Sequence, residues 1–300
     1  MIQYFNRVTQ NVETEKVYGG EYLKWAYESK LGFFLTEHFF SRKWLSLLFG
    51  VYESSQFSRS KIEDFIKRYE IQMDDFEKTE YTSFNDFFIR KFKSGKRNFA
   101  SGSNTFCAGA EARYLAFPDL KMSQKFRVKG FEIDLTELLR NEETAKEFIG
   151  GTLVIARLCP VDYHRFHFPF SGKLTEHYRV AGHFHSVNPA AFPAEPKVFL
   201  KNERQVAILE HESLGRVAMI EVGALGVGKI VQSAYSSRLS LPVKFDKGQE
   251  KGYFLFGGST VIWLIQKDKV KFSADLMANS AKDLETWIPL GHSLGEGWPA

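Results

Sequence analysis

The sequence predicts an α+β fold, with an N-terminal helical region packed on a mainly antiparallel β core that is sandwiched or barrel-like. In the first third of the chain, apolar residues recur at helical intervals. Later segments are short, β-prone and separated by frequent turns. The 29 phenylalanines indicate a ring-rich core. We expect a helical region over residues 1–93 and a β-rich core over residues 94–300.

The first helical stretch, Tyr18 to Tyr52, is dense in aromatic residues and leucine and is interrupted by lysine and arginine. It predicts two short helices. Their apolar faces either cover the domain behind them or lie at a lipid headgroup boundary, where aromatic and basic side chains occur together.

Two further helices have recognisable start signals. Ser60 to Ile71 carries apolar residues at helical spacing, and Ser60 and Glu63 are spaced as a capping box. Ser83 is a candidate N-cap for a helix that begins at Phe84. Both are expected to pack on the rest of the protein.

The second part of the chain reads as strands. Asp134 to Phe148 interrupts it with helical character. The predicted strands are Phe126 to Lys129, Gly151 to Leu158, Lys173 to Val180, Gln205 to Glu210, Arg216 to Val222 and Lys229 to Gln232.

Composition excludes several classes of protein. The net charge of +4 is small for 300 residues, and no basic stretch alternates with stacking aromatics, so we expect no nucleic acid partner. Two cysteines, Cys107 and Cys159, fit no metal-ligand spacing and favour a reducing compartment. No apolar run reaches the roughly 20 residues of a spanning helix.

The most unusual stretch is Lys251 to Ile265, where Gly257, Gly258 and Ser259 join two apolar β-prone runs. One explanation is a bulge or a close backbone approach. The other is chemical: the Ser259 hydroxyl attacks the Gly258 carbonyl, the amide becomes an ester, and β-elimination breaks the chain. The new amino end then becomes a pyruvoyl group, which accepts electrons.

Such chemistry needs a base, and His164 and His167 are candidates. Both lie in a proline-bracketed aromatic segment, and imidazole titrates near neutrality. They could also be structural, or a metal pair that lacks a third ligand. Glu111, in a loop before a strand, could orient a histidine or be merely solvated.

Two other segments are candidates for a metal site and for a phosphate-binding loop, and neither fits. His183 and His185 would share one face of an extended chain, but two ligands do not make a metal site, and we expect no metal. The glycines between Glu221 and Ile230 have the wrong spacing for a phosphate loop, so no nucleotide is expected.

Together, several stretches resemble the phosphatidylserine decarboxylase family, from the early helices to the C-terminus. Their order and joint presence carry the resemblance. They are Phe84 to Arg90, Asp162 to His167, Ser186 to Pro189, Asn202 to Arg204, Val222 to Ala224 and Gly257 to Thr260.

The resemblance implies a proenzyme that cuts itself between Gly258 and Ser259, leaving associated β (1–258) and α (259–300) chains and a pyruvoyl group derived from Ser259. His167 matches the relay base. Glu111 falls where the family usually has aspartate. His164 resembles the histidine of the later decarboxylation steps, which proceed through a Schiff base.

The implied substrate is phosphatidylserine and the implied product phosphatidylethanolamine. We therefore expect an anionic membrane surface as partner, with the protein peripheral on the cytoplasmic face of the cell membrane. The alternatives are a pyruvoyl decarboxylase of a soluble amine, a serine hydrolase with uncut Ser259, and a β-rich binding module without catalysis.

Overall fold

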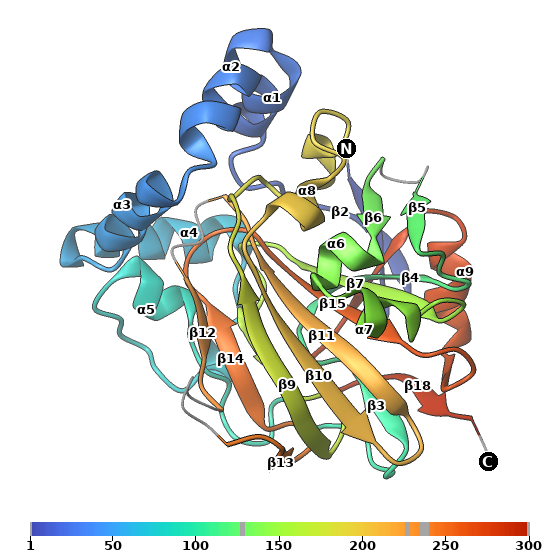
Figure 1. Ribbon diagram of the computed structural model, residues 1–300. Helices are drawn as coiled ribbons and strands as arrows, with labels where there is room; N and C mark the ends of the chain where they lie inside the picture. The colour runs from blue at the N-terminus through green and yellow to red at the C-terminus, as the bar shows by residue number, and fades with distance from the viewer. Residues whose placement is uncertain (1, 127–129, 226–228, 235–239, 299–300) are drawn as a thin grey trace.

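The computed structural model describes residues 2–126, 130–225, 229–234 and 240–298. Its centre is a ten-stranded sheet, which is antiparallel apart from the parallel pair β1 and β17 (Figure 1). From one edge to the other, its strands are β13 Val243–Phe245, β9 Gly172–Val180, β10 Arg204–His211, β11 Gly215–Gly223, β15 Ser259–Ile265, β7 Thr152–Leu158, β4 Ala112–Phe117, β17 Glu285–Ile288, β1 Gln3–Asn6 and β2 Asn11–Thr14.

Two three-stranded sheets cover one face of the large sheet. They contain β12 Ile230–Gln232, β14 Glu250–Phe254 and β8 Arg165–His167, and β16 Val270–Phe272, β18 Ser293–Gly297 and β3 Thr105–Cys107. Phe166, Phe254 and Phe106 pack there against Val261 and Trp263 of β15. Of the two expected arrangements the sandwich is the one observed, and the described strand order of the large sheet is open.

Short elements cover the other face, where Ile262 and Leu264 point. Because β15 has its odd and even side chains buried on opposite faces, its sequence reads as a continuous apolar run. The covering elements are α6 Leu135–Leu139, α7 Glu142–Lys146, α8 Val198–Lys201 and the pair β5 Ser123–Lys125 and β6 Glu132–Asp134, while α9 Ala274–Ser280 joins the first core.

The helical region lies between β2 and β3, and its helices α1 and α2 project away from the sheets (Figure 1). Since β1 and β2 belong to the large sheet, the first residues of the chain are not helical. The region contains α1 Gly20–Glu28, α2 Lys30–Leu35, a π-helical turn Thr36–Phe40, α3 Lys43–Glu53, a 3₁₀ turn Gln56–Lys61, α4 Ile62–Tyr69, a 3₁₀ turn Met73–Asp75 and α5 Phe84–Phe88. A last 3₁₀ turn, Pro189–Ala191, precedes α8.

The α+β class and most expected elements are confirmed. The Ser83 cap is present, because its hydroxyl accepts a bond from the Asp86 amide. The capping box was wrong: Ser60 lies in a 3₁₀ turn and donates to the Phe57 carbonyl, and α4 begins only at Ile62.

Two predicted elements differ in their bounds. Asp134 to Phe148 forms two short helices, because Arg140 has a φ of 54° and ends the first of them. Of the strand predicted at Phe126 to Lys129, residues 127–129 lie outside the described part of the chain. Among the described residues, no helix combines the length and apolar character that crossing a membrane requires.

Candidate active site

Residues 255–258 carry the chain from β14 in one layer to β15 in the other. Gly257 has a φ of 140°, which side chains rarely adopt, so the backbone requires glycine there. A Cβ on Gly258 would lie 3.5 Å from the Val187 Cγ2 atom, an ordinary contact. Packing therefore does not require glycine at 258.

Helix α5 holds this turn in place. The Asn85 side-chain oxygen accepts a bond of 2.7 Å from the Phe256 amide, and its nitrogen donates to the Ser54 hydroxyl at 2.9 Å. The Phe256 ring contacts Phe88, with 5.2 Å between centroids. The sequence pointed to this helix through the family resemblance but gave no role to Asn85.

Ser259 begins β15 and is completely buried between Leu158 of β7 and Gly223 of β11. Strand alternation puts its side chain on the same face as Val261, toward the three-stranded sheets. Its hydroxyl has no hydrogen-bond partner among the described residues. A buried unpaired hydroxyl costs about 1–3 kcal/mol, so this one needs an explanation.

His164 is also completely buried, and its ring lies 3.9 Å from that of Phe88. Its Nδ1 is 3.0 Å from the Asp162 carbonyl. Because a carbonyl only accepts, Nδ1 carries the proton, and Nε2 is an unprotonated nitrogen with no partner among the described residues. Burial lowers the pKa of His164 to about 3, so the ring is neutral near pH 7.

His167 ends β8, where it pairs with Glu250 at the beginning of β14. Its Nδ1 donates to the Gly248 carbonyl at 2.9 Å, and its Nε2 accepts from the Tyr163 hydroxyl at 3.4 Å. Burial lowers the pKa of His167. The Gly257 turn follows the opposite end of β14. His167 and the turn are therefore separated by the length of that strand.

Glu111 is nearly buried, and Arg97 holds its carboxylate with contacts of 2.6 and 3.2 Å. Arg97 has no role in the sequence prediction. Within the described residues, no hydrogen bond joins Glu111, His167 and Ser259 to one another, so their relay stays a prediction. Through Phe88, His164 is linked by packing to Phe256 in the Gly257 turn.

A cavity of about 460 Å³ is lined by Gly257 and Gly258 and is mainly apolar. The helical region and the core both contribute to its lining. Aromatic density in the sequence was the only signal for the helical contribution, which includes Tyr18, Tyr22, Leu23, Phe40 and Phe49 with Lys16 and Lys61. The core contributes Leu158 to Pro160, Ser186 to Asn188, Gly257 and Gly258.

His183 and His185 lie in the connection after β9, outside this turn. Asn202 fixes the backbone of His185, accepting from its amide at 2.9 Å and donating to its carbonyl at 2.8 Å. It also donates to the Gly223 carbonyl next to the β15 pairing. Glu37 lies close to both histidines, which the sequence could not reveal.

Comparisons with known proteins agree with the resemblance. The family model for phosphatidylserine decarboxylase matches residues 84–283. A phosphatidylserine decarboxylase proenzyme of Fusobacterium nucleatum is 40% identical over 296 residues, covering 98% of this chain and 97% of that protein. Proenzymes of the same name from Clostridium botulinum strain Kyoto and Clostridium tetani are each 38% identical, over 297 and 298 residues. These alignments cover 98% and 99% of this chain, and 99% and 98% of the two relatives, respectively.

The fold, the Gly-Ser junction and these matches define the class of protein: the chain is an enzyme, a carboxy-lyase. It belongs to the phosphatidylserine decarboxylase family, as the sequence motifs predicted.

Proposed function

We propose that this chain is a proenzyme that cuts itself between Gly258 and Ser259 and then decarboxylates phosphatidylserine to phosphatidylethanolamine. One observation carries the proposal. Buried Ser259, whose hydroxyl has no hydrogen-bond partner among the described residues, directly follows a glycine that lines an apolar cavity.

The cut uses atoms of the chain and one water molecule. The Ser259 Oγ attacks the Gly258 carbonyl carbon, and the amide nitrogen leaves with a proton, which forms an ester. Elimination of the ester leaves a carboxylate on Gly258 and a dehydroalanine at position 259. Water then replaces its nitrogen, ammonia departs, and the new terminus is a pyruvoyl group. The β chain is 1–258 and the α chain 259–300.

The base in this proposal is His167, oriented by Glu111. Both groups are occupied in the structure, His167 by Tyr163 and Glu111 by Arg97. The relay therefore requires both contacts to open before the serine proton can be taken. A Glu111→Gln substitution keeps the shape and removes the charge, so the rate of processing should fall at least tenfold.

A time course of intact mass on the purified chain measures that rate. Glu77→Gln changes an acidic residue for which the proposal has no use and is the control. Equal processing of Glu111→Gln and the parent would remove Glu111 from the relay.

The residues around Ser259 fit a pyruvoyl group. The Ser259 hydroxyl makes no hydrogen bond to a described residue, so converting Ser259 to a pyruvoyl group would break none. Strands β7 and β11 pair with β15 on both sides and hold the residues that follow position 259. When present, the group supplies an electron-accepting carbonyl that promotes loss of carbon dioxide. The chain supplies the proton transfer: the unprotonated Nε2 of His164 takes up a proton and returns it to the substrate carbon.

The helical region supports a lipid substrate. Trp44 and Leu48 of α3 and Phe34 of α2 are between 53% and 58% exposed. Extracting a two-chain lipid into water costs ~0.8 kcal/mol per CH₂, so an enzyme acting on it works best docked on the membrane. We infer that residues 1–93 bind an anionic membrane surface and that the protein is peripheral there.

We place it on the cytoplasmic face because both cysteines, Cys107 and Cys159, are unpaired and buried, as in reducing compartments. The associated β and α chains remain one folded unit in this proposal, since β15 of the α chain lies in the middle of the large sheet.

Intact-mass measurement of the purified protein tests the first stage. We expect two chains, the smaller lighter by one ammonia than a hydrolysed 259–300 fragment. A single full-length chain that is nonetheless active would overturn the proposal and favour a serine hydrolase.

Substrate choice is tested separately on the cut enzyme. Carbon dioxide release should be observed with phosphatidylserine vesicles and not with free serine or phosphoserine. Borohydride added with substrate should trap an adduct on the α chain. Turnover of the soluble amines alone would support the soluble-amine alternative instead.

A further inference from the structure

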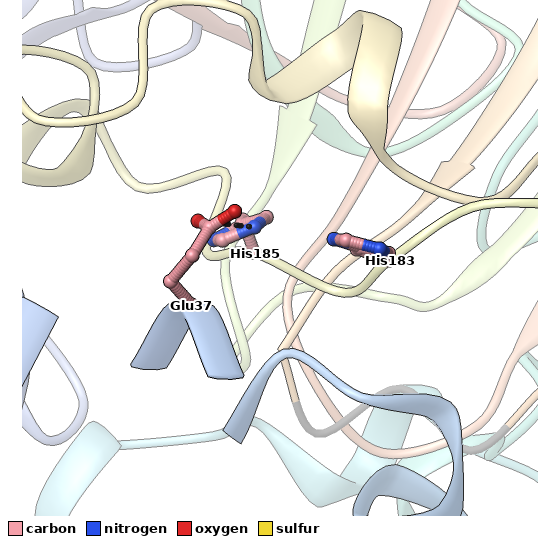
Figure 2. Close-up of side chains that lie close together, drawn as sticks. All are labelled: Glu37, His183 and His185. Carbon is pink, nitrogen blue, oxygen red and sulfur yellow. Dashed lines mark ion pairs between the residues drawn. The ribbon is translucent and has the colours of Figure 1, made fainter. Parts of the chain in front are cut away.

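Three side chains from two segments that are far apart in the sequence lie close together beside the helical region. Glu37 comes from the π-helical turn Thr36–Phe40, and His183 and His185 come from the extended segment after β9 (Figure 2). Each offers one ligand atom, and these atoms lie within 4.8 Å of one another. In Figure 2 the Glu37 carboxylate is directed at the His185 ring, and His183 lies beyond it.

Four buried polar atoms of this cluster lack hydrogen-bond partners among the described residues. His185 is completely buried, and neither of its ring nitrogens has a partner. The Glu37 Oε2 and the His183 Nδ1 are also buried without a hydrogen-bond partner among the described residues. Several unpaired polar groups in one place point to a missing ligand.

We propose that Glu37, His183 and His185 bind a Zn²⁺ ion, with a water molecule in the fourth position. Two imidazoles and a carboxylate form a ligand set that zinc accepts. The His185 Nε2 and Glu37 Oε2 are 3.4 Å apart. Two ligands of one tetrahedral zinc, each about 2.0–2.1 Å from the ion, are separated by about 3.4 Å, so this pair already has the required spacing.

His183, the third ligand, reaches the ion after a small movement of its ring. The His183 ring must move inward by about an ångström to bring its nitrogen within ~2.1 Å of the same ion. Its Nδ1 has no partner among the described residues and is the candidate ligand atom. Its Nε2 lies 3.4 Å from the Arg42 guanidinium, which only donates, so Nδ1 carries the proton of the neutral ring in this arrangement. Metal binding through Nδ1 therefore requires the proton to move to Nε2 and the long Arg42 contact to open.

The backbone that carries the histidines is held from several sides. The His183 amide donates to the Lys201 carbonyl at 2.9 Å, and the Phe184 amide donates to the Ser41 carbonyl at 2.8 Å. Phe184 is buried in the core, so alternation turns the two flanking histidines to the opposite side. The ligand positions are therefore largely preformed, which lowers the cost of ordering them on binding.

Two cations lie near the cluster, and one of them is already compensated. The Lys201 ammonium lies 3.5 Å from the Glu37 Oε1 but 2.5 Å from Glu195, which holds it. This leaves the Oε2 of Glu37 for the metal. Arg42 has no ion pair among the described residues, and its guanidinium must turn away from the His183 Nε2 when the ion binds.

A metal at this position would tie the helical region to the core. Glu37 belongs to the helical region, whereas His185 immediately precedes Ser186 to Asn188, which line the cavity beside Gly258. The ion would fix the helices over that cavity. This positioning role concerns metal binding alone and does not depend on the proposed self-cleavage.

The test is metal binding to the full chain after chelator treatment and dialysis. Calorimetry with Zn²⁺ should show one saturable site, and Co²⁺ should give the strong visible absorption of a tetrahedral site. His185→Ala and Glu37→Gln should each weaken Zn²⁺ binding at least tenfold. His38→Ala should bind as the parent does, because His38 is the exposed neighbour of Glu37 and contacts Phe34 instead.

Glu37→Gln keeps the shape of the side chain, so it still reports if His185→Ala fails to fold, which circular dichroism will show. Absence of saturable Zn²⁺ binding to the parent would overturn the proposal. Equal binding by the parent, Glu37→Gln and His185→Ala would also overturn it, because the ion would then sit elsewhere. Neither readout uses decarboxylase activity.

Discussion

Strand β15 and helix α3 are similarly apolar in sequence but have opposite surroundings. Val261, Ile262, Trp263 and Leu264 of β15 are 0% exposed, whereas Trp44, Leu47 and Leu48 of α3 are 46–58% exposed. Hydrophobicity therefore does not determine whether a segment is buried in its own chain. We infer that β15 is covered by protein on both faces and that α3 is covered by lipid.

The largest effect is expected at the start of β15. Ser259→Ala removes the nucleophile, so processing and decarboxylation should both be lost completely, although the fold should persist because alanine fits the same buried space. Gel electrophoresis and intact mass will show a single full-length chain. This variant also supplies an uncut protein for stability measurements.

Thr260→Val is its matched control. Thr260 is the next residue, is equally buried, and its hydroxyl also has no partner among the described residues. Alternation puts its side chain on the other face of the sheet, so this variant should still be cut. If Thr260→Val also blocks the cut, the unpaired Ser259 hydroxyl no longer explains it.

Two tryptophans allow a direct test of the contrast between core and helical region. Trp263→Ala should lower the free energy of unfolding by ~3–5 kcal/mol, because the ring is fully buried and stacks on Tyr114. Trp44→Ala should cost no more than ~0.5 kcal/mol. Urea unfolding of both in the Ser259→Ala background measures the difference, and equal losses would mean that Trp44 is structurally buried.

The burial of His164 predicts a smaller, pH-dependent effect. The folded state keeps the ring neutral down to its pKa of about 3, while the unfolded chain binds a proton below about 6.5. Between these values the unfolded state holds more protons, so stability falls as pH falls. From pH 6.5 to 5 the loss due to this group is ~2 kcal/mol.

Urea unfolding at several pH values in the Ser259→Ala background, with and without His164→Gln, isolates this contribution. The His164→Gln variant should lose less stability on acidification than its parent. Parallel pH profiles would show that His164 is protonated alike in both states.

The sequence predicted the parts of this molecule that depend on local pattern. Alternation and apolar runs located β7, β9, β10 and β11, and Ser83 located the start of α5. The Ser60 cap failed because a 3₁₀ turn uses that hydroxyl locally, and the pattern does not distinguish the two uses.

For the site, the glycine-serine junction could be predicted from the sequence because it requires unusual residues next to each other. Contacts between distant segments could not be predicted in this way. Arg97 on Glu111 and Glu37 beside His185 each join residues whose separate positions carry no signal. Ordinary charged residues gain a role only when the tertiary fold brings them together.

A small effect on stability and the sharpest test of the contrast are expected on the surface of the helical region. Leu31, Leu48 and Phe57 are between 58% and 74% exposed on three different elements. Replacing all three with serine should change the free energy of unfolding by no more than about 1 kcal/mol in total. Each apolar side chain fully buried in lipid contributes ~1.5–3 kcal/mol, so binding to phosphatidylserine vesicles should weaken at least a hundredfold.

Vesicle flotation measures that binding, and Ile149→Ser is the control, since Ile149 is 45% exposed but lies just after α7, away from the helical region. The control should float as the parent does. If the triple variant floats equally well, the exposed side chains of the helical region do not enter the lipid. The contrast with β15 would then have to be explained by a protein partner that covers α3.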